Sequence, residues 1–264
     1  MHLLHCAWDE SSSPRTVSIS LRACISHVPP PYAILSHRWA ANPEDEVTFD
    51  DMMAGASAGA NRAQAKPGYE KLRMTCTQAL LDGLSWAWID TCCIDKRSSA
   101  ELSEAINSMF SWYEKSDRCY AYLEDVYSIP APLEGTFESE LRSSVWFSRG
   151  WTLQELIAPA EVEFFAHGWR CIGAKTNMAP RLSRMTGIAE KALVSGIDVY
   201  EASVAEKMSW AANRITTRPE DRAYSLMGLF GVNMPTLYGE GHSAFTRLQH
   251  EIMRLTSDHT IFTW

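Results

Sequence analysis

The chain has 264 residues, of which 46% are hydrophobic and 21% are charged, with a formal net charge of −8 and a pI near 5.5. This composition is ordinary for a globular protein and is enough to bury a substantial core in one domain, or in one domain with a helical extension. The acidic balance argues against general nucleic-acid binding, which needs a basic surface.

The cysteines and the apolar segments indicate the cellular compartment of the protein. Seven cysteines occur without any Cys-x-x-Cys spacing, which is typical of free thiols in a reducing compartment. The adjacent Cys92 and Cys93 form a poor chelating unit, so no metal site is expected. No run approaches the roughly 18 apolar residues of a membrane span, and the first ten residues lack the pattern of a signal peptide. We therefore expect a cytoplasmic protein.

Residues 1–30 are mixed and polar, and the first strand is predicted at residues 32–36. This short, nearly all-apolar run suits a strand that is buried on both faces of a parallel sheet. His37, Arg38 and Trp39 follow it directly, at the end of a strand where ligands gather in open α/β sheets. A purely structural role is the alternative for His37.

The next elements alternate between helix and strand. A surface loop is predicted at 50–68, a helix at 69–81 and a strand at 86–90. A helix of about four turns follows, starting at the capping-box pair Ser98 and Glu101, then a strand at 119–123 and a loop at 127–138. Asp90 and Cys92 come at the carboxyl end of the second strand, as His37 does at the first.

Residues 151–157 fit a short amphipathic helix that carries Glu155 and ends near Pro159. A carboxylate on a mostly apolar helix is a candidate for electrostatic or acid–base chemistry. The alternative is a solvated glutamate, or one that is paired with Arg149. With a further strand at 162–166, the pattern predicts a three-layer, flavodoxin-like α/β fold with a mainly parallel sheet over residues 1–174.

Residues 175–264 are expected to form a helical extension that packs on this core. Its helices are predicted at 203–213, 217–229 and 243–255 from capping residues and apolar spacing. A charged cluster, defined here as Arg214, Arg218, Glu220, Asp221 and Arg222, is interpreted as an ion-paired network that docks the extension on the sheet. A substrate lid or an oligomer face is the alternative.

Several common motifs are missing from the sequence. There is no Gly-rich dinucleotide or P-loop fingerprint, no nucleophile elbow and no His-Glu-x-x-His pair. A thiol hydrolase that uses Cys92 or Cys93 with His37 remains an alternative, because both positions follow strands.

Four segments together resemble the fungal heterokaryon-incompatibility (HET) domain. They are Tyr-Ala-Ile-Leu-Ser-His-Arg-Trp at 32–39, Trp-Ile-Asp-Thr-Cys-Cys-Ile-Asp-Lys at 88–96, Arg-Gly-Trp-Thr-Leu-Gln-Glu-Leu at 149–156 and Arg-Pro-Glu-Asp-Arg-Ala-Tyr at 218–224. One departure is Ala40 after Trp39, where the family usually has glycine. Through this family the chain is also distantly similar to TIR domains, whose Trp-Cys-x-x-Glu-Leu segment resembles residues 151–156.

The resemblance implies a role in programmed cell death after recognition of non-self. Enzymatic TIR domains hydrolyse NAD with the glutamate of that segment, so Glu155 is the implied catalytic residue, NAD the implied substrate, and no other cofactor is expected. Self-association is implied for the active form, and a non-catalytic signalling module is the alternative. Trp39 or Trp151 would stack on a base and Arg38 or Arg149 would meet the pyrophosphate. The full set of implied substrate-binding residues is Ser36, His37, Arg38, Trp39, Asp90, Cys92, Arg149 and Trp151.

Overall fold

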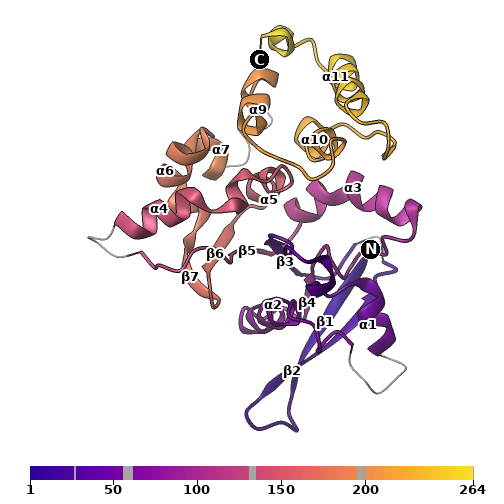
Figure 1. The fold of residues 1–264 in the computed structure, drawn as a ribbon, viewed down its shortest axis with the longest axis vertical. Coiled ribbons are helices and arrows are strands. Elements are labelled where there is room, and N and C mark those ends of the chain that lie inside the picture. Colours follow the sequence, from indigo (N-terminus) through magenta and orange to yellow (C-terminus); the bar gives the residue numbers. More distant parts are fainter. Residues whose placement is uncertain (27, 56–61, 131–134, 195–198, 200, 264) are drawn as a thin grey trace. The chain divides into compact units, whose positions relative to one another are not determined.

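A computed structural model describes residues 1–26, 28–55, 62–130, 135–194, 199 and 201–263 (Figure 1). The chain divides into two compact units. Unit 1 comprises residues 1–105 and 116–122, and unit 2 comprises residues 106–115 and 123–264. The predicted boundary between residues 174 and 175 stays a prediction.

Unit 1 is built around a mixed sheet. Its strands are β1 (His2–Asp9), β2 (Thr16–Ala23), β3 (Ala33–His37), β4 (Trp86–Trp88) and β5 (Arg118–Leu123, its last residue counted with unit 2), in the order β2-β1-β4-β3-β5. β3 pairs in parallel with β4 and with β5, whereas β1 is antiparallel to β2 and β4. Every residue of β3 is buried, as expected for an apolar strand in the middle of a covered sheet.

The β1–β2 hairpin corrects the expectation that the first strand lies at 32–36. In β1 the buried residues Leu3 and Leu4 are adjacent, so the strand does not show a clean alternation of polar and apolar side chains. β2 does alternate, with Val17, Ile19 and Leu21 between polar residues, and this period of two is a usable strand signal.

Helices cover both faces of this sheet. α2 (Tyr69–Leu81) confirms the predicted helix and packs against the strands, whereas the first part of α3 (Ser99–Glu114) lies over the other face (Figure 1). A hydrogen bond of 3.0 Å joins Nδ1 of His2 in β1 to Oε1 of Glu101 in α3. The expected three-layer α/β fold is therefore confirmed, with antiparallel strands added at its edge.

Two short helical segments precede α2 in unit 1. η1 spans Pro43–Asp45 and α1 spans Phe49–Gly55, so the loop predicted at 50–68 is wrong in its first part. Residues 56–61 of that loop lie outside the described residues.

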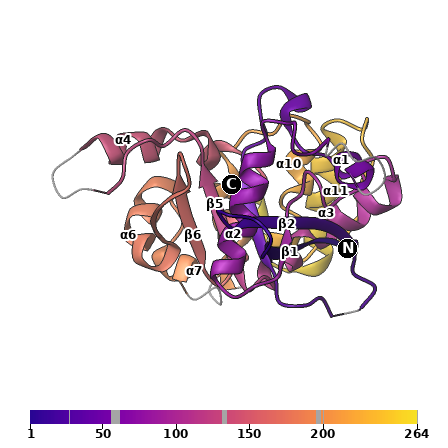
Figure 2. The ribbon, with the colours of Figure 1, turned by 90° about the horizontal axis from the view of Figure 1, so that it is seen from below.

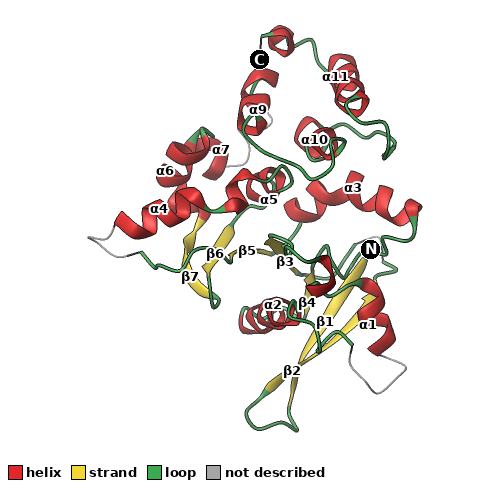
Figure 3. Ribbon diagram, in the orientation of Figure 1, coloured by secondary structure: helices red, strands yellow, loops and turns green. Residues whose placement is uncertain are grey.

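Beyond β5, unit 2 continues with short helices and a β-hairpin (Figures 2 and 3). The elements are α4 (Gly135–Ser143), η2 (Val145–Ser148), α5 (Thr152–Ile157), β6 (Val162–Ala166), β7 (Arg170–Ala174), α6 (Lys175–Thr186) and α7 (Glu190–Val194). β6 confirms the predicted strand and pairs antiparallel with β7, and α6 packs against this pair. The loop predicted at 127–138 ends at α4, and residues 131–134 lie outside the described residues.

The remainder of unit 2 is helical, as predicted. It contains α9 (Val204–Ala211), α10 (Asp221–Tyr224), η3 (Gly228–Phe230), α11 (Ser243–Leu255) and η4 (His259–Phe262). The capping box of Ser203 and Glu206 is formed as its spacing indicated. The single helix expected at 217–229 is wrong, because the segment is divided into α10 and η3 by a turn.

Candidate functional site

In unit 1, the carboxyl ends of three parallel strands bring polar side chains together. The chain runs from β3 to β4 and then back past β3 to β5, so the strand order reverses at β3. Ligands of open α/β sheets bind at such a point of reversal, outside the carboxyl ends of the strands. His37, the last residue of β3, is the register partner of Tyr122 in β5.

Asp90, which follows β4, contacts two of the site residues predicted at the end of β3. Its carboxylate accepts a hydrogen bond of 2.8 Å from Trp39 Nε1 and lies 3.8 Å from His37 Nε2. The His37 side chain is 1% exposed and that of Asp90 is 24% exposed, whereas Trp39 is 38% exposed. The structure therefore places Asp90 between a buried imidazole and an accessible indole, within one unit.

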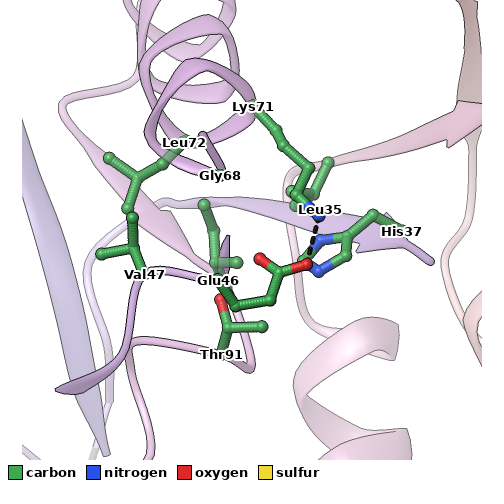
Figure 4. Close-up of a pocket in the computed structure, with 9 residues that line it drawn as sticks. Leu35, His37, Glu46, Val47, Gly68, Lys71, Leu72 and Thr91 are labelled. Atoms are coloured by element: carbon green, nitrogen blue, oxygen red, sulfur yellow. Dashed lines mark hydrogen bonds and ion pairs between the residues drawn. The ribbon is translucent and has the colours of Figure 1, made fainter. Parts of the chain in front are cut away.

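A small pocket adjoins His37 (Figure 4). It has essentially no enclosed volume, whereas pockets for whole ligands measure roughly 300–1,000 Å³. Glu46 and Lys71 form an ion pair in its wall. The ammonium of Lys71 also donates to the Arg38 carbonyl oxygen at 3.2 Å. The side chains around His37 therefore leave no room for a ligand at this place.

Glu46 and Lys71 were not singled out from the sequence as site residues. Glu46 accepts a hydrogen bond of 2.6 Å from the Ala40 amide, so it fixes the backbone that follows Trp39. The only available signal for Glu46 was its place in the acidic run at 44–46 that follows β3. This bond shows how the loop with Ala40 in place of glycine is held.

Ser36 and Cys92 are placed differently from the other predicted site residues. Both are fully buried, and the Cys92 thiol lies 3.9 Å from the carbonyl oxygen of Ile89. Burial raises the pKa of the Cys92 thiol well above its usual range. A thiolate nucleophile needs the opposite shift, so this environment disfavours the thiol-hydrolase alternative.

The environment of Asp90 predicts a pH-dependent stability. Burial raises the pKa of this carboxyl, against the opposing charge of Lys96 and the hydrogen bond from Trp39. A folded-state pKa above the unfolded value means that stability is lost as the pH rises through the raised pKa. Asp90→Asn is therefore expected to raise the Tm at pH 7 and to leave it unchanged at pH 3.

Thermal denaturation of the parent and of Asp90→Asn across this range checks the expectation. Asp50→Asn is the matched control, because Asp50 is exposed in its pair with Arg97. A lower Tm for Asp90→Asn at pH 7 would show that ionised Asp90 stabilises unit 1.

In unit 2, Glu155 lies on a helix that is buried on every side. All six residues of α5 are buried, so the expected amphipathic pattern is wrong. Glu155 is 8% exposed and Gln154 is 1% exposed, which also rules out the solvated glutamate that was considered as an alternative. A buried carboxylate requires compensation of its charge.

Arg214 supplies a positive charge to this region. Its guanidinium donates to the Arg149 carbonyl oxygen and to the Thr152 hydroxyl, both at 2.9 Å, at the start of α5. Burial of the guanidinium lowers the pKa of Arg214 to about 10, and the charge of Glu155 opposes that shift. Arg214 is therefore still cationic at neutral pH, where it stabilises the ionised form of Glu155.

The other predicted residues of unit 2 surround the entry to α5. Arg149 is partly buried and pairs through its backbone with Ile215, while Gly150 donates its amide to the Ile215 carbonyl oxygen at 2.9 Å. Burial raises the pKa of the Asp221 carboxyl, and the nearby Trp151 side chain opposes that shift. Unit 2 thus brings Trp151 close to the charged cluster.

The charged cluster is held mainly by hydrogen bonds and ring contacts, which differs from the expected network of ion pairs. Glu220 accepts from the amides of Gly239 and Gly241 at 2.8 and 3.0 Å. Asp221 accepts from the Tyr238 hydroxyl at 2.9 Å, and the guanidinium of Arg218 lies 4.5 Å from the centre of the Tyr238 ring. These contacts tie α10 to the loop before α11, so the cluster is structural within unit 2.

Asp221→Ala is expected to destabilise unit 2 because the Tyr238 hydroxyl loses its acceptor. The expected loss is about 1–3 kcal/mol for a buried donor that is left unpaired. A Tm that is lower by several degrees, compared with an unchanged Tm for the exposed control Glu190→Ala, supports a structural role. An unchanged Tm for Asp221→Ala contradicts it.

The described residues form neither a cluster of metal ligands nor a helix that could span a membrane. Over the described ranges, no group of three or more His, Cys, Asp or Glu side chains is placed to hold a metal ion. No helix within the part of the chain that the structure describes is long and apolar enough to span a membrane.

Comparison with known proteins identifies similar sequences. Residues 32–129 match the family model of the heterokaryon incompatibility protein (HET). The chain is 46% identical over 226 residues to the vegetative incompatibility protein HET-E-1 of Podospora anserina. That alignment covers 84% of this chain and 16% of the relative, so the chain spans about a sixth of the relative's length. No solved structure matches the chain.

Proposed function

The chain belongs to the heterokaryon incompatibility (HET) family, and from this premise we propose that it acts in non-self recognition by hydrolysing the nicotinamide–ribose bond of NAD. Loss of NAD would then kill the cell. The relative is named as a vegetative incompatibility protein, which supports the biological part of the proposal. The chemical part depends on Glu155.

The observation that carries the proposal is the burial of Glu155 beside a cation. A carboxylate that is 8% exposed lies away from bulk water, and the nearby charge of Arg214 favours its ionised form. Charges arranged in this way act more strongly than they do in water, and they need no reorganisation during the reaction. This is the environment that a carboxylate needs in order to stabilise a developing positive charge.

The reaction creates such a charge. When the bond between the ribose C1′ and the pyridinium nitrogen breaks, both bonding electrons leave with neutral nicotinamide and the ribose becomes oxocarbenium-like. The ionised Glu155 stabilises that cation or holds the ribose hydroxyls. Water then adds to C1′ and releases a proton, so the products are nicotinamide, ADP-ribose and H⁺.

Arg149 and Trp151 complete the proposed machinery of unit 2. Arg149 carries the positive charge that would meet a pyrophosphate, and Trp151 offers an indole close to Asp221. The substrate contacts of Ser36, His37, Arg38, Trp39, Asp90 and Cys92 stay predictions. NAD enters as substrate, and no resident cofactor is proposed.

The proposal is tested by product analysis with the purified chain and NAD. We expect nicotinamide and ADP-ribose to appear in equal amounts, and the rate per chain to rise with protein concentration if self-association activates the enzyme. The absence of both products, even when the chain is clustered by a fused oligomerisation module, would contradict hydrolysis. That outcome would support the alternative of a non-catalytic signalling module that acts through self-association and partner contacts.

A further inference from the structure

The indole of Trp39 in unit 1 already holds a cation. The ammonium nitrogen of Lys96 lies 3.7 Å from the centre of the Trp39 ring. At this distance an ammonium is attracted by the negative face of the ring. Lys96 lies in the turn that follows β4, and its side chain reaches back to the residues after β3.

Asp90 supplies the counter-charge for this arrangement. Its carboxylate binds the edge of the same indole through Trp39 Nε1 at 2.8 Å, and the charges of Asp90 and Lys96 stabilise each other. An aromatic face with a fixed carboxylate at its edge is a general way to bind an organic cation. The ring is fixed by Asp90, whereas the lysine arrives on a flexible four-carbon stem.

The Lys96 side chain can leave the Trp39 ring without disturbing the turn, whereas Trp39 and Asp90 are held together by a hydrogen bond. Lys96 is exposed, and the neighbouring Asp95 is engaged with Arg97 at 2.9 Å, so rotation of the Lys96 stem leaves the turn in place. The ammonium is partly desolvated where it lies, because burial lowers the pKa of Lys96, and this cost offsets part of its attraction to the ring. A ligand that covers more of the indole can therefore displace it.

We propose that the Trp39 face, together with Asp90, is a binding site for a planar organic cation of the N-alkylated pyridinium class, and that Lys96 occupies this site in the free chain. A flat, delocalised cation covers more of an indole than an ammonium does, and it loses less hydration when it binds. The site also lies where the strand order reverses, the place at which open α/β sheets bind ligands. The choice of this ligand class rests on the proposed function, because the nicotinamide ring of NAD is such a cation, but binding by unit 1 does not require hydrolysis by Glu155.

The test uses 1-methylnicotinamide, which cannot be hydrolysed at a ribose bond, and its uncharged counterpart nicotinamide. Binding is measured by calorimetry for the full chain and for Lys96→Met, which keeps the length of the stem and removes the charge. We expect Lys96→Met to bind 1-methylnicotinamide roughly twofold to fivefold more tightly than the parent, because the internal competitor is gone. Lys96→Arg should bind the probe no more tightly than the parent, because its planar guanidinium also competes for the ring, and the distant Lys115→Met should bind as the parent does.

Three further measurements make the outcome decisive. Trp39→Leu in the Lys96→Met background should lose binding while it keeps its Tm, and nicotinamide should bind at least tenfold more weakly than 1-methylnicotinamide. In the parent, the NMR signal of the Trp39 indole N–H should move as the probe is added. Equal binding by the parent and Lys96→Met, equal binding of the neutral probe, or binding that survives Trp39→Leu would each overturn the proposal.

Discussion

Glu155→Gln is expected to lower the rate of nicotinamide release from NAD by roughly 100-fold or more. Loss of one preorganised electrostatic group typically costs about 10²–10³ in rate, and glutamine keeps the shape of glutamate while it removes the charge. Because the proposed role is to stabilise an oxocarbenium-like charge, the effect should fall on kcat more than on KM. A KM change with kcat preserved would instead assign Glu155 to ground-state binding.

The folding of this variant needs its own control, because the charge on Arg214 loses its compensation when Glu155 is neutralised. Glu155→Gln combined with Arg214→Met removes both charges and should recover only part of the Tm, because the hydrogen bonds of Arg214 to Arg149 and Thr152 are lost as well, without restoring activity. Recovery of activity in the double variant would show that the single change acted through misfolding.

Gly228→Ala is expected to give the largest loss of stability among the substitutions considered. A Cβ atom at Gly228 would lie 2.1 Å from Cβ and 2.6 Å from Cγ of Phe110 on α3. Phe110 Cβ is bonded to the helix backbone and cannot rotate away, so η3 must shift. Overpacking of this kind costs typically about 1–3 kcal/mol, and we expect a value at the upper end.

Two variants separate the close approach from a general effect of adding a methyl group. Gly135→Ala should leave the Tm unchanged or slightly raised, since nothing lies within 4 Å of its added Cβ and alanine favours the helix that starts there. Phe110→Leu should not rescue Gly228→Ala, because the Cβ at position 110 remains. A parent-like Tm for Gly228→Ala by thermal denaturation would contradict the packing of η3 on α3.

The elements with strong local signals could be predicted from the sequence. The apolar spacing of α2 and α11 gave their bounds, and the Ser203–Glu206 capping box gave the start of α9. The divided segment of α10 and η3 could not be predicted, because the close approach of Gly228 to Phe110 joins residues that are more than 100 positions apart. The β1–β2 hairpin was missed although β2 alternates, because β1 does not.

The sequence predicted several of the residues that lie at the candidate site, but it did not predict how deeply they are buried or which side chains contact them. The position of His37, Trp39 and Asp90 after neighbouring strands follows from strand order, and the structure joins them within unit 1. The burial of α5 on all sides was not predictable, since six residues are too few to show which faces are covered. The contact of Lys96 with Trp39 depends on the turn after β4, which leaves no periodic signal.

The most direct test of the central claim is nicotinamide release from NAD by the parent, Glu155→Gln and Glu190→Gln at matched protein concentration. Glu190 is an exposed glutamate of the same unit and controls for the loss of one negative charge. Release by the parent and by Glu190→Gln, with loss in a folded Glu155→Gln, is the result that we predict. Equal release by all three proteins would contradict a catalytic role for Glu155.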